Sequence, residues 1–303
     1  MLTCVAISLP YIHIGAADAA REVSWSWEPA LTLPLLAFGI LLLVGSILLG
    51  KRTHCSRQWR DRTILLGLGW LSLLFALNSP IHELGEHLFW VHMIQHEILL
   101  LISAPLLVLG NAWATILAAL PSAVSARVAH VLRITGIQAA MLALSRPLPA
   151  WLLGTAALWI WHVPRLFDAT LDSDWVHAAQ HLSFLSTAFL FWLSLLESRA
   201  RQASYGISIL YLFATAVHTS FLGVLLTYSA RPWYSSYSQT GSPFGYTPLQ
   251  DQQLGGLIMW VPAGAVFTTI ALCLVPAWLR ASDARRALWS EETNVVKAQR
   301  SQP

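Results

Sequence analysis

Long apolar runs recur along the whole 303-residue sequence, and they constrain the fold more than any other feature. A run of about 18 or more apolar residues can cross roughly 30 Å of hydrocarbon as an α-helix, which rises about 1.5 Å per residue. Only 11% of the residues are charged and 56% are hydrophobic, whereas an ordinary soluble domain is about 25% charged. Such a chain cannot cover a water-facing surface, so we predict an all-α, polytopic integral membrane protein.

Seven apolar segments are expected to form transmembrane helices. They lie at residues 30–50, 63–79, 88–110, 149–163, 176–196, 205–228 and 254–279, the fourth being short for a span. The stretch 111–146 is expected to hold a helix on the membrane surface, because Pro121 interrupts it and Arg127, His130 and Arg133 recur on one side. The transmembrane bundle is therefore placed at residues 25–280, and residues 281–303 are expected to form a basic cytoplasmic tail.

Basic loops alternate with acidic loops along the chain. Lysine and arginine gather at residues 51–62, 127–146, 199–201 and 280–300, whereas the loops IHELGEHLFW and PRLFDATLDSDW between them are acidic. Short basic loops stay on the cytoplasmic side of a membrane. We therefore expect the N-terminus outside and the C-terminus inside.

The N-terminal residues 1–20 are a possible signal peptide. They combine a moderately apolar core with an alanine-rich segment that offers an A-x-A cleavage site, although basic residues before the core are missing and Pro10 and His13 interrupt it.

Several classes of function find no support in the sequence. The formal net charge is only +3 and the basic residues lie in short clusters, so nucleic-acid binding is not indicated. The cysteines Cys4, Cys55 and Cys273 show no CxxC spacing, which argues against a disulfide framework and a thiolate metal site. No HExxH motif, phosphate loop or nucleophile beside a base is visible, so we do not expect an enzyme.

Two histidine pairs lie within the expected transmembrane helices. His92 and His96 are four residues apart on one helix, and His177 and His181 repeat that spacing on another. Residues four apart share one face of a helix, which is the spacing that two ligands of one metal ion need. Because ionisable groups are costly in hydrocarbon, they indicate a functional site.

The expected topology places the histidines in one layer. The third and fifth helices run inward, so both pairs lie in their outer halves, and the outward-running fourth helix ends at His162. His218 and Met259 lie on the sixth and seventh helices, where both can approach the same depth. We therefore predict a metal site near the outer face with the candidate residues His92, His96, His162, His177, His181, His218 and Met259.

Alternatives remain for these residues. Imidazole suits copper, zinc and iron, and a thioether such as Met93 or Met259 favours copper(I). Each histidine can instead be a hydrogen-bonding group between helices, because equal depth alone does not bring the rings together. Glu97 is a candidate to orient an imidazole, whereas Glu83 and Glu86 are expected to be solvated loop charges.

Small residues in the last helix indicate close packing. The segment DQQLGGLIMWVPAG contains Gly255, Gly256 and Gly264, and glycine lets a neighbouring helix approach closely in a membrane.

Four motifs occur in order between residues 75 and 275. They are His92-Met93-x-x-His96 followed by LLLISAPLLVLG, then WHVPRLFDATL, then WVHAAQHLSFL, then QQLGGLIMWVPAG. With these motifs the sequence resembles the CtaG family of cytochrome c oxidase assembly factors associated with caa-type oxidases, a polytopic membrane family. It departs from the family at Gln180, where an acidic residue is expected.

The resemblance implies a protein of the bacterial inner (plasma) membrane that is needed to mature a haem-copper oxidase. It further implies that oxidase subunits are the partners and that copper is delivered to them. Carried over by position, His92, His96, His162, His177 and His181 would be the metal-site residues. Two other functions stay open. One is a b-type haem protein that carries electrons, with axial imidazoles from two helices; the other is a copper or proton transporter, which needs a polar path through the inner half as well.

Overall fold

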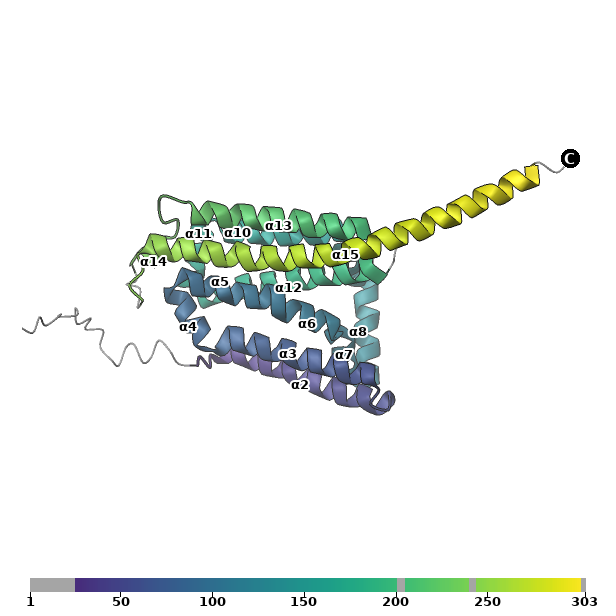
Figure 1. The fold of residues 1–303 in the computed structure, drawn as a ribbon. Coiled ribbons are helices and arrows are strands. Elements are labelled where there is room, and N and C mark those ends of the chain that lie inside the picture. Colours follow the sequence, from purple (N-terminus) through teal and green to yellow (C-terminus); the bar gives the residue numbers. More distant parts are fainter. Residues whose placement is uncertain (1–24, 201–204, 240–243, 301–303) are drawn as a thin grey trace, which may run out of the picture.

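The computed structural model describes residues 25–200, 205–239 and 244–300, and every described element is a helix (Figure 1). The longest elements are α2 (Pro29–Arg52), α3 (Arg57–Asn78), α12 (Asp174–Ala200), α13 (Tyr205–Thr227) and α15 (Pro248–Arg300). The all-α prediction is confirmed for this part of the chain. The possible signal peptide at residues 1–20 lies outside the described residues.

The structure supports five or six membrane spans. Five helical segments are long and apolar enough to cross a membrane, and a sixth is obtained if α3 and α4 (Pro80–His87), which meet at 43°, are counted as one span. The five are Leu31–Arg52, Phe89–Leu109, Asp174–Leu196, Tyr205–Thr227 and Pro248–Ala284. The chain is therefore an integral, multi-pass membrane protein, but the expected number of seven is not reached by this measure.

The expected fourth span is the short helix α10 (Pro147–Trp161), which has only 15 residues. It begins at Pro147 and ends before Val163, which takes an extended conformation ahead of Pro164. A residue that precedes proline is disfavoured in the α conformation, so α10 stops there and the short helix α11 (Pro164–Asp172) follows.

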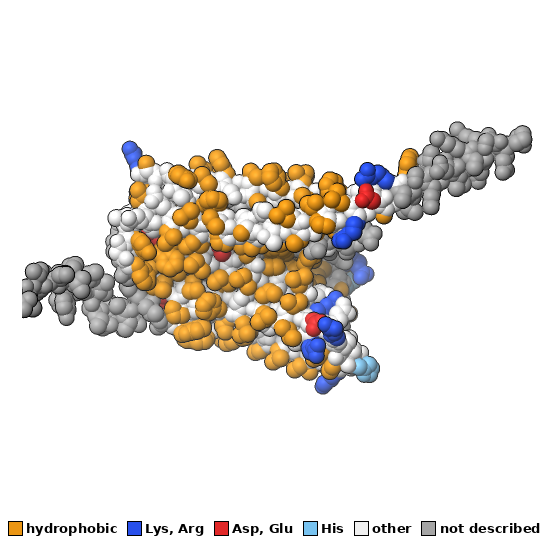
Figure 2. Space-filling model, viewed as in Figure 1, with side chains coloured by type: hydrophobic (Ala, Val, Ile, Leu, Met, Phe, Trp, Pro, Cys, Tyr) orange, Lys and Arg blue, Asp and Glu red, His pale blue; other side chains and the backbone are white. Residues whose placement is uncertain are grey.

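The two ends of the bundle differ in charge. We call one end the histidine end; it holds α4, α11 and α14 (Ser235–Gln239) (Figure 1). We call the opposite end the basic end; it holds the turn at residues 53–56 and α8 (Ser122–Ile134). Figure 2 shows most of the visible Lys and Arg side chains at the basic end, with apolar side chains covering the region between the ends. Arg165 and Arg231 are exceptions, because they belong to the histidine end.

The segment between the third span and α10 forms three short helices. They are α7 (Ala112–Ala119), α8 and α9 (Ile137–Leu144). Pro121 separates α7 from α8, and Gly136, with φ +73°, allows the turn into α9 because glycine adopts this left-handed conformation without strain. Figure 1 shows α8 running across the basic end rather than along the bundle.

The third span contains a wide turn. The helix α5 (Phe89–Glu97) continues into the π-helix η1 (Ile98–Ser103) and then into α6 (Ala104–Leu109). Pro105 has no N–H to donate, and the N–H of Ala104 bonds to Leu99 instead of Leu100. Trp192 of α12 donates its Nε1–H to the Leu100 carbonyl at 2.8 Å. Such turns are frequent at functional sites.

Glycines set the close contact between α13 and α15. A Cβ added to Gly256 would lie 2.8 Å from the Gly223 carbonyl oxygen, and one added to Gly223 would lie 2.6 Å from Trp260 Cβ. A Cβ on Gly255 would meet the ring of Phe89 in α5. Around Gly264 the nearest atom is Ser220 Oγ at 3.8 Å. The predicted close packing is therefore present at Gly255 and Gly256 but not at Gly264.

This difference predicts unequal effects of alanine. Gly256→Ala is expected to destabilise the bundle, because overpacking costs about 1–3 kcal/mol. Gly264→Ala is the matched control on the same helix and should be neutral or slightly stabilising, since alanine favours a helix over glycine by about 1 kcal/mol. Thermal unfolding of both variants in detergent checks this, and equal melting temperatures would contradict the close contact.

Candidate metal centre

A bend after α3 brings His82 towards the histidine pairs. Ser79 has an extended backbone before Pro80, and its Oγ accepts a hydrogen bond from the N–H of Ile81 at 3.3 Å. This cap starts α4 and turns the chain by 43° relative to α3. His82 is consequently buried, with 2% of its surface exposed.

The position of α5 is fixed by a carboxylate from α15. Leu88 is extended, so the first N–H groups of α5 have no partner within the helix. Asp251 accepts from Phe89 N at 2.9 Å and from Trp90 N at 3.0 Å. A negative charge is also favourable at a helix N-terminus. Asp251 therefore anchors α5 about one turn before His92.

Histidine rings from three helices form one continuous cluster. The ring centroids of His92 and His96 are 4.4 Å apart, and those of His177 and His181 are 4.3 Å apart. Between the helices, His92 lies 5.1 Å from His177, and His96 lies 5.4 Å from His181. His82 of α4 stacks on His177 at 5.3 Å. The two pairs noted in the sequence thus meet in space.

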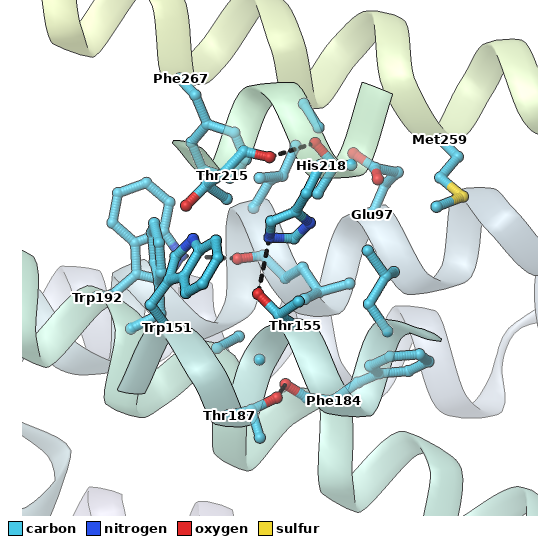
Figure 3. Close-up of a pocket in the computed structure, with 18 residues that line it drawn as sticks. Glu97, Trp151, Thr155, Phe184, Thr187, Trp192, Thr215, His218, Met259 and Phe267 are labelled. Atoms are coloured by element: carbon cyan, nitrogen blue, oxygen red, sulfur yellow. Dashed lines mark hydrogen bonds between the residues drawn. The ribbon is translucent and has the colours of Figure 1, made fainter. Parts of the chain in front are cut away.

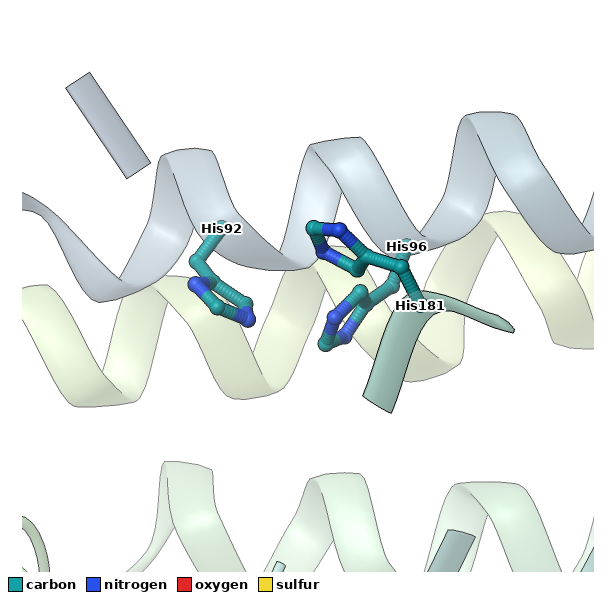
Figure 4. Close-up of side chains that lie close together, drawn as sticks. All are labelled: His92, His96 and His181. Carbon is teal, nitrogen blue, oxygen red and sulfur yellow. The ribbon is translucent and has the colours of Figure 1, made fainter. Parts of the chain in front are cut away.

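Three of these residues form a group that we call the histidine triad, namely His92, His96 and His181 (Figure 4). Each offers one nitrogen, and the three nitrogens lie within 4.8 Å of one another. Their exposed fractions are 0%, 3% and 4%. Imidazole nitrogens bind zinc at about 2.0–2.1 Å, so the rings would have to turn towards one another for all three nitrogens to bind one ion.

Several ring nitrogens in this region are buried without a hydrogen-bond partner. They are His96 Nε2, His162 Nε2, His177 Nε2, and both ring nitrogens of His181. Leaving a buried polar atom unpaired costs about 1–3 kcal/mol. Histidines that only joined helices through hydrogen bonds would have used these atoms, whereas a bound cation would take up the one lone pair that each neutral ring offers.

Neighbouring side chains orient His92. Its Nε2 lies 3.2 Å from Gln180 Oε1, and its Nδ1 lies 3.4 Å from the hydroxyl of Tyr237, which donates to the Gly85 carbonyl at 2.6 Å. Burial raises the pKa of Tyr237 well above its ordinary value, so the hydroxyl stays protonated. Gln180 stands where an acidic residue was expected, and its amide oxygen can accept the Nε2–H. Such contacts fix the ring that binds a metal.

His162 lies one aromatic ring away from the triad. Its centroid is 6.0 Å from Phe167 and 6.4 Å from Phe184, and these rings contact His92 at 5.1 Å and His96 at 4.7 Å. Its Nδ1 lies 2.7 Å from the backbone carbonyl one turn earlier. If Nδ1 carries the proton and donates it to this carbonyl, the lone pair of the ring is on Nε2, which has no hydrogen-bond partner. His162 is therefore beside the triad but not within it.

A second group of possible ligands combines the predicted residue His177 with His82 and Glu86, which were not predicted for the site. His82, Glu86 and His177 also offer three ligand atoms within 4.8 Å of one another. Glu86, expected to be a solvated loop charge, lies on the helix α4, one turn after His82. Ser79-Pro80 is a typical helix start, and His82 and Glu86 follow it four residues apart. This spacing was the signal in the sequence for a second pair of ligands.

His218 and Met259 lie in a different place, together with Glu97. The three line a cavity of about 90 Å³ (Figure 3). His218 Nε2 is 3.1 Å from Thr155 Oγ1, and its ring packs on Trp151 at 5.4 Å. His218 and Met259 therefore line the same cavity, and neither belongs to the triad.

This separation gives a test of the ligand set. His218→Ala is expected to leave metal binding at the triad unchanged, because its ring contacts Trp151 and Thr155 rather than the clustered histidines. The metal content per chain after loading and dialysis measures this, with wild-type protein beside it. A loss of one metal equivalent would place His218 among the ligands.

The chain is similar in sequence to a protein family and to mycobacterial proteins. The family model of the cytochrome c oxidase caa3 assembly factor matches residues 23–281. An uncharacterized protein of Mycobacterium bovis and one of Mycobacterium tuberculosis are each 28% identical over 225 residues, which cover 70% of this chain and 33% of the relative. The chain thus spans about a third of the length of these relatives. No solved structure matches.

Proposed function

The chain belongs to the cytochrome c oxidase caa3 assembly factor family, and from this membership we propose that it holds copper at the histidine triad and passes it to the maturing oxidase. The observation that carries the proposal is the set of buried, unpartnered nitrogens on histidines that converge from α5 and α12. Copper is here the cargo of the protein, and the oxidase subunits that receive it are its partners.

The donor set suits a transferable ion. Imidazole nitrogens bind copper as well as zinc and iron, and the family points to copper because the oxidase is a haem-copper enzyme. Three protein ligands leave a coordination position open. A ligand from the recipient oxidase can bind the ion at that position before the histidines release it. His162 and Gln180 would support the triad from outside it.

Charge asymmetry supports an orientation for the site. Because lysine and arginine concentrate on the cytoplasmic side, the basic end would face the cytoplasm, together with residues 281–303. The histidine end would then face the outer aqueous side of the bacterial inner (plasma) membrane. Copper would be taken up and released on that side.

The spacing of the rings favours an ion over haem. The ring centroids are 4.3 and 4.4 Å apart within the two pairs and 5.1 to 5.9 Å apart between them. Rings in contact leave no room between them for a flat macrocycle held by two axial imidazoles. The purified protein is therefore expected to show no Soret band, and a Soret band at one haem per chain would overturn the copper proposal.

A complementation experiment tests the function in cells. In a strain that lacks this protein, the oxidase is expected to contain little copper and to have low activity, and added copper should restore part of it. Wild-type protein should restore both properties, whereas His96→Ala with His181→Ala should not, although it reaches the membrane in equal amount. Full copper content in the oxidase of the deletion strain would contradict the proposal.

A further inference from the structure

The second ligand group lies between the triad and the surface of the histidine end. The helix α12 begins at the exposed Asp174, reaches His177 one turn later and reaches His181 after a further turn. One turn of helix is about 5.4 Å. Glu86 is partly exposed, whereas the triad is buried. An ion coming from the surface would meet His82, Glu86 and His177 first.

We propose that His82, Glu86 and His177 form a second copper site, which receives the ion at the histidine end and loads the triad. This inference rests on the proposed function and adds a route to it. The three ligand atoms lie within 4.8 Å of one another. The rings of His82 and His177 are stacked at an interplanar angle of 12°, and His177 Nε2 has no hydrogen-bond partner.

The two groups differ in charge, which gives the transfer a direction. Glu86 contributes a carboxylate to the outer group, whereas the triad consists of imidazoles only. A carboxylate near water attracts a cation at long range. Imidazole is the better ligand for copper, so the ion gains affinity as it moves inward.

Further carboxylates strengthen the attraction. Glu28, Glu83 and Asp174 all act electrostatically on Glu86. In the described part of the chain none of these four carboxylates is paired with a Lys or Arg, since the ion pairs there join Asp61 and Asp283 to arginines at the basic end.

Ring contacts connect the two groups. His177 lies 4.3 Å from His181 on the same helix and stacks on His92 at 5.1 Å with an interplanar angle of 20°. An ion held by His177 can therefore exchange one ligand at a time for an imidazole of the triad. Gln95 holds the ring of His82 in place, since its Nε2 lies 3.0 Å from His82 Nδ1.

Copper(I) titration of the full-length protein in detergent, against a coloured copper(I) chelator, tests the loading site. Wild-type protein should take up two equivalents. His82→Ala with Glu86→Gln should take up one, at the triad, and should load it about ten-fold or more slowly, as expected when steering charge is lost. Glu86→Gln alone should slow loading without disturbing the fold. His87→Ala, on the same helix but outside both groups, is the control and should behave as wild type.

The outcomes separate the two proposals. Wild-type protein that takes up no copper would overturn the proposed function. Wild-type protein that takes up a single equivalent, at a rate unaffected by His82→Ala and Glu86→Gln, would overturn the loading site alone. The variant His96→Ala with His181→Ala should keep one weakly held equivalent, and loss of that equivalent would also contradict a separate outer site.

Discussion

Replacing His96 and His181 together with alanine is expected to remove tightly bound copper from the protein. Both residues belong to the triad, and His181 has no hydrogen-bond partner on either ring nitrogen. Loss of an outer-shell partner already lowers metal affinity by about 10–100-fold, so loss of two direct ligands should lower it by more than about 100-fold. Elemental analysis of protein purified without oxygen measures the bound copper.

Two controls accompany this variant. His218→Ala removes a partly buried histidine outside the cluster, and His87→Ala removes a partly buried histidine at the end of α4. Both should keep their copper. If the double variant retained one tightly bound copper while the melting temperature stayed normal, the triad would be wrong as the copper site.

Replacing Asp251 with alanine is expected to weaken both the fold and copper binding. The two N–H groups at the start of α5 would lose their acceptor, and a hydrogen bond to a charged group contributes about 1.5–3 kcal/mol. Without this anchor α5 is less firmly held against α15, so His92 and His96 are less well placed. Asp251→Asn keeps one acceptor oxygen and should be intermediate.

Asp283→Ala is the matched control, because Asp283 lies on the same helix and forms an exposed ion pair with Arg286 at 2.9 Å. Exposed ion pairs contribute only about 0–1 kcal/mol. Melting temperature and copper affinity should therefore be unchanged in this variant. Equal values for Asp251→Ala and Asp283→Ala would show that Asp251 does not position α5.

Local patterns account for what the sequence could predict. Hydropathy identified the helical segments because a span is a property of consecutive residues. The i, i+4 spacing placed His92 and His96 on one face, and likewise His177 and His181, because helix geometry alone decides this. The meeting of the two pairs depended on how α5 and α12 face each other, which neither pattern contains.

His218 shows why equal depth in the membrane was not sufficient to predict which residues share one metal site. The helix α13 is apolar on most sides, and its lipid-facing and protein-facing residues are chemically alike, as is usual in membranes. Its rotation about its own axis therefore could not be predicted. In the structure His218 faces Trp151 and Thr155 of α10.

His82 and Glu86 of the second ligand group were not predicted, because their position beside His177 depends on a bend. The loop expected around Glu83 and Glu86 is the helix α4, and its direction is set where α3 ends at Ser79-Pro80. A similar limit applies to the glycines, since the sequence did not distinguish Gly256 from Gly264. The two glycines differ only in how closely the neighbouring helix α13 approaches them.

X-ray absorption at the copper edge, on protein loaded with one equivalent, tests the central claim most directly. The copper is expected to have a first shell of nitrogen only, at about 2.0 Å, with the outer scattering typical of imidazole. His96→Ala with His181→Ala should lose this pattern. A first shell that contains sulfur, or an unchanged spectrum in the double variant, would contradict a copper site built from the triad of α5 and α12.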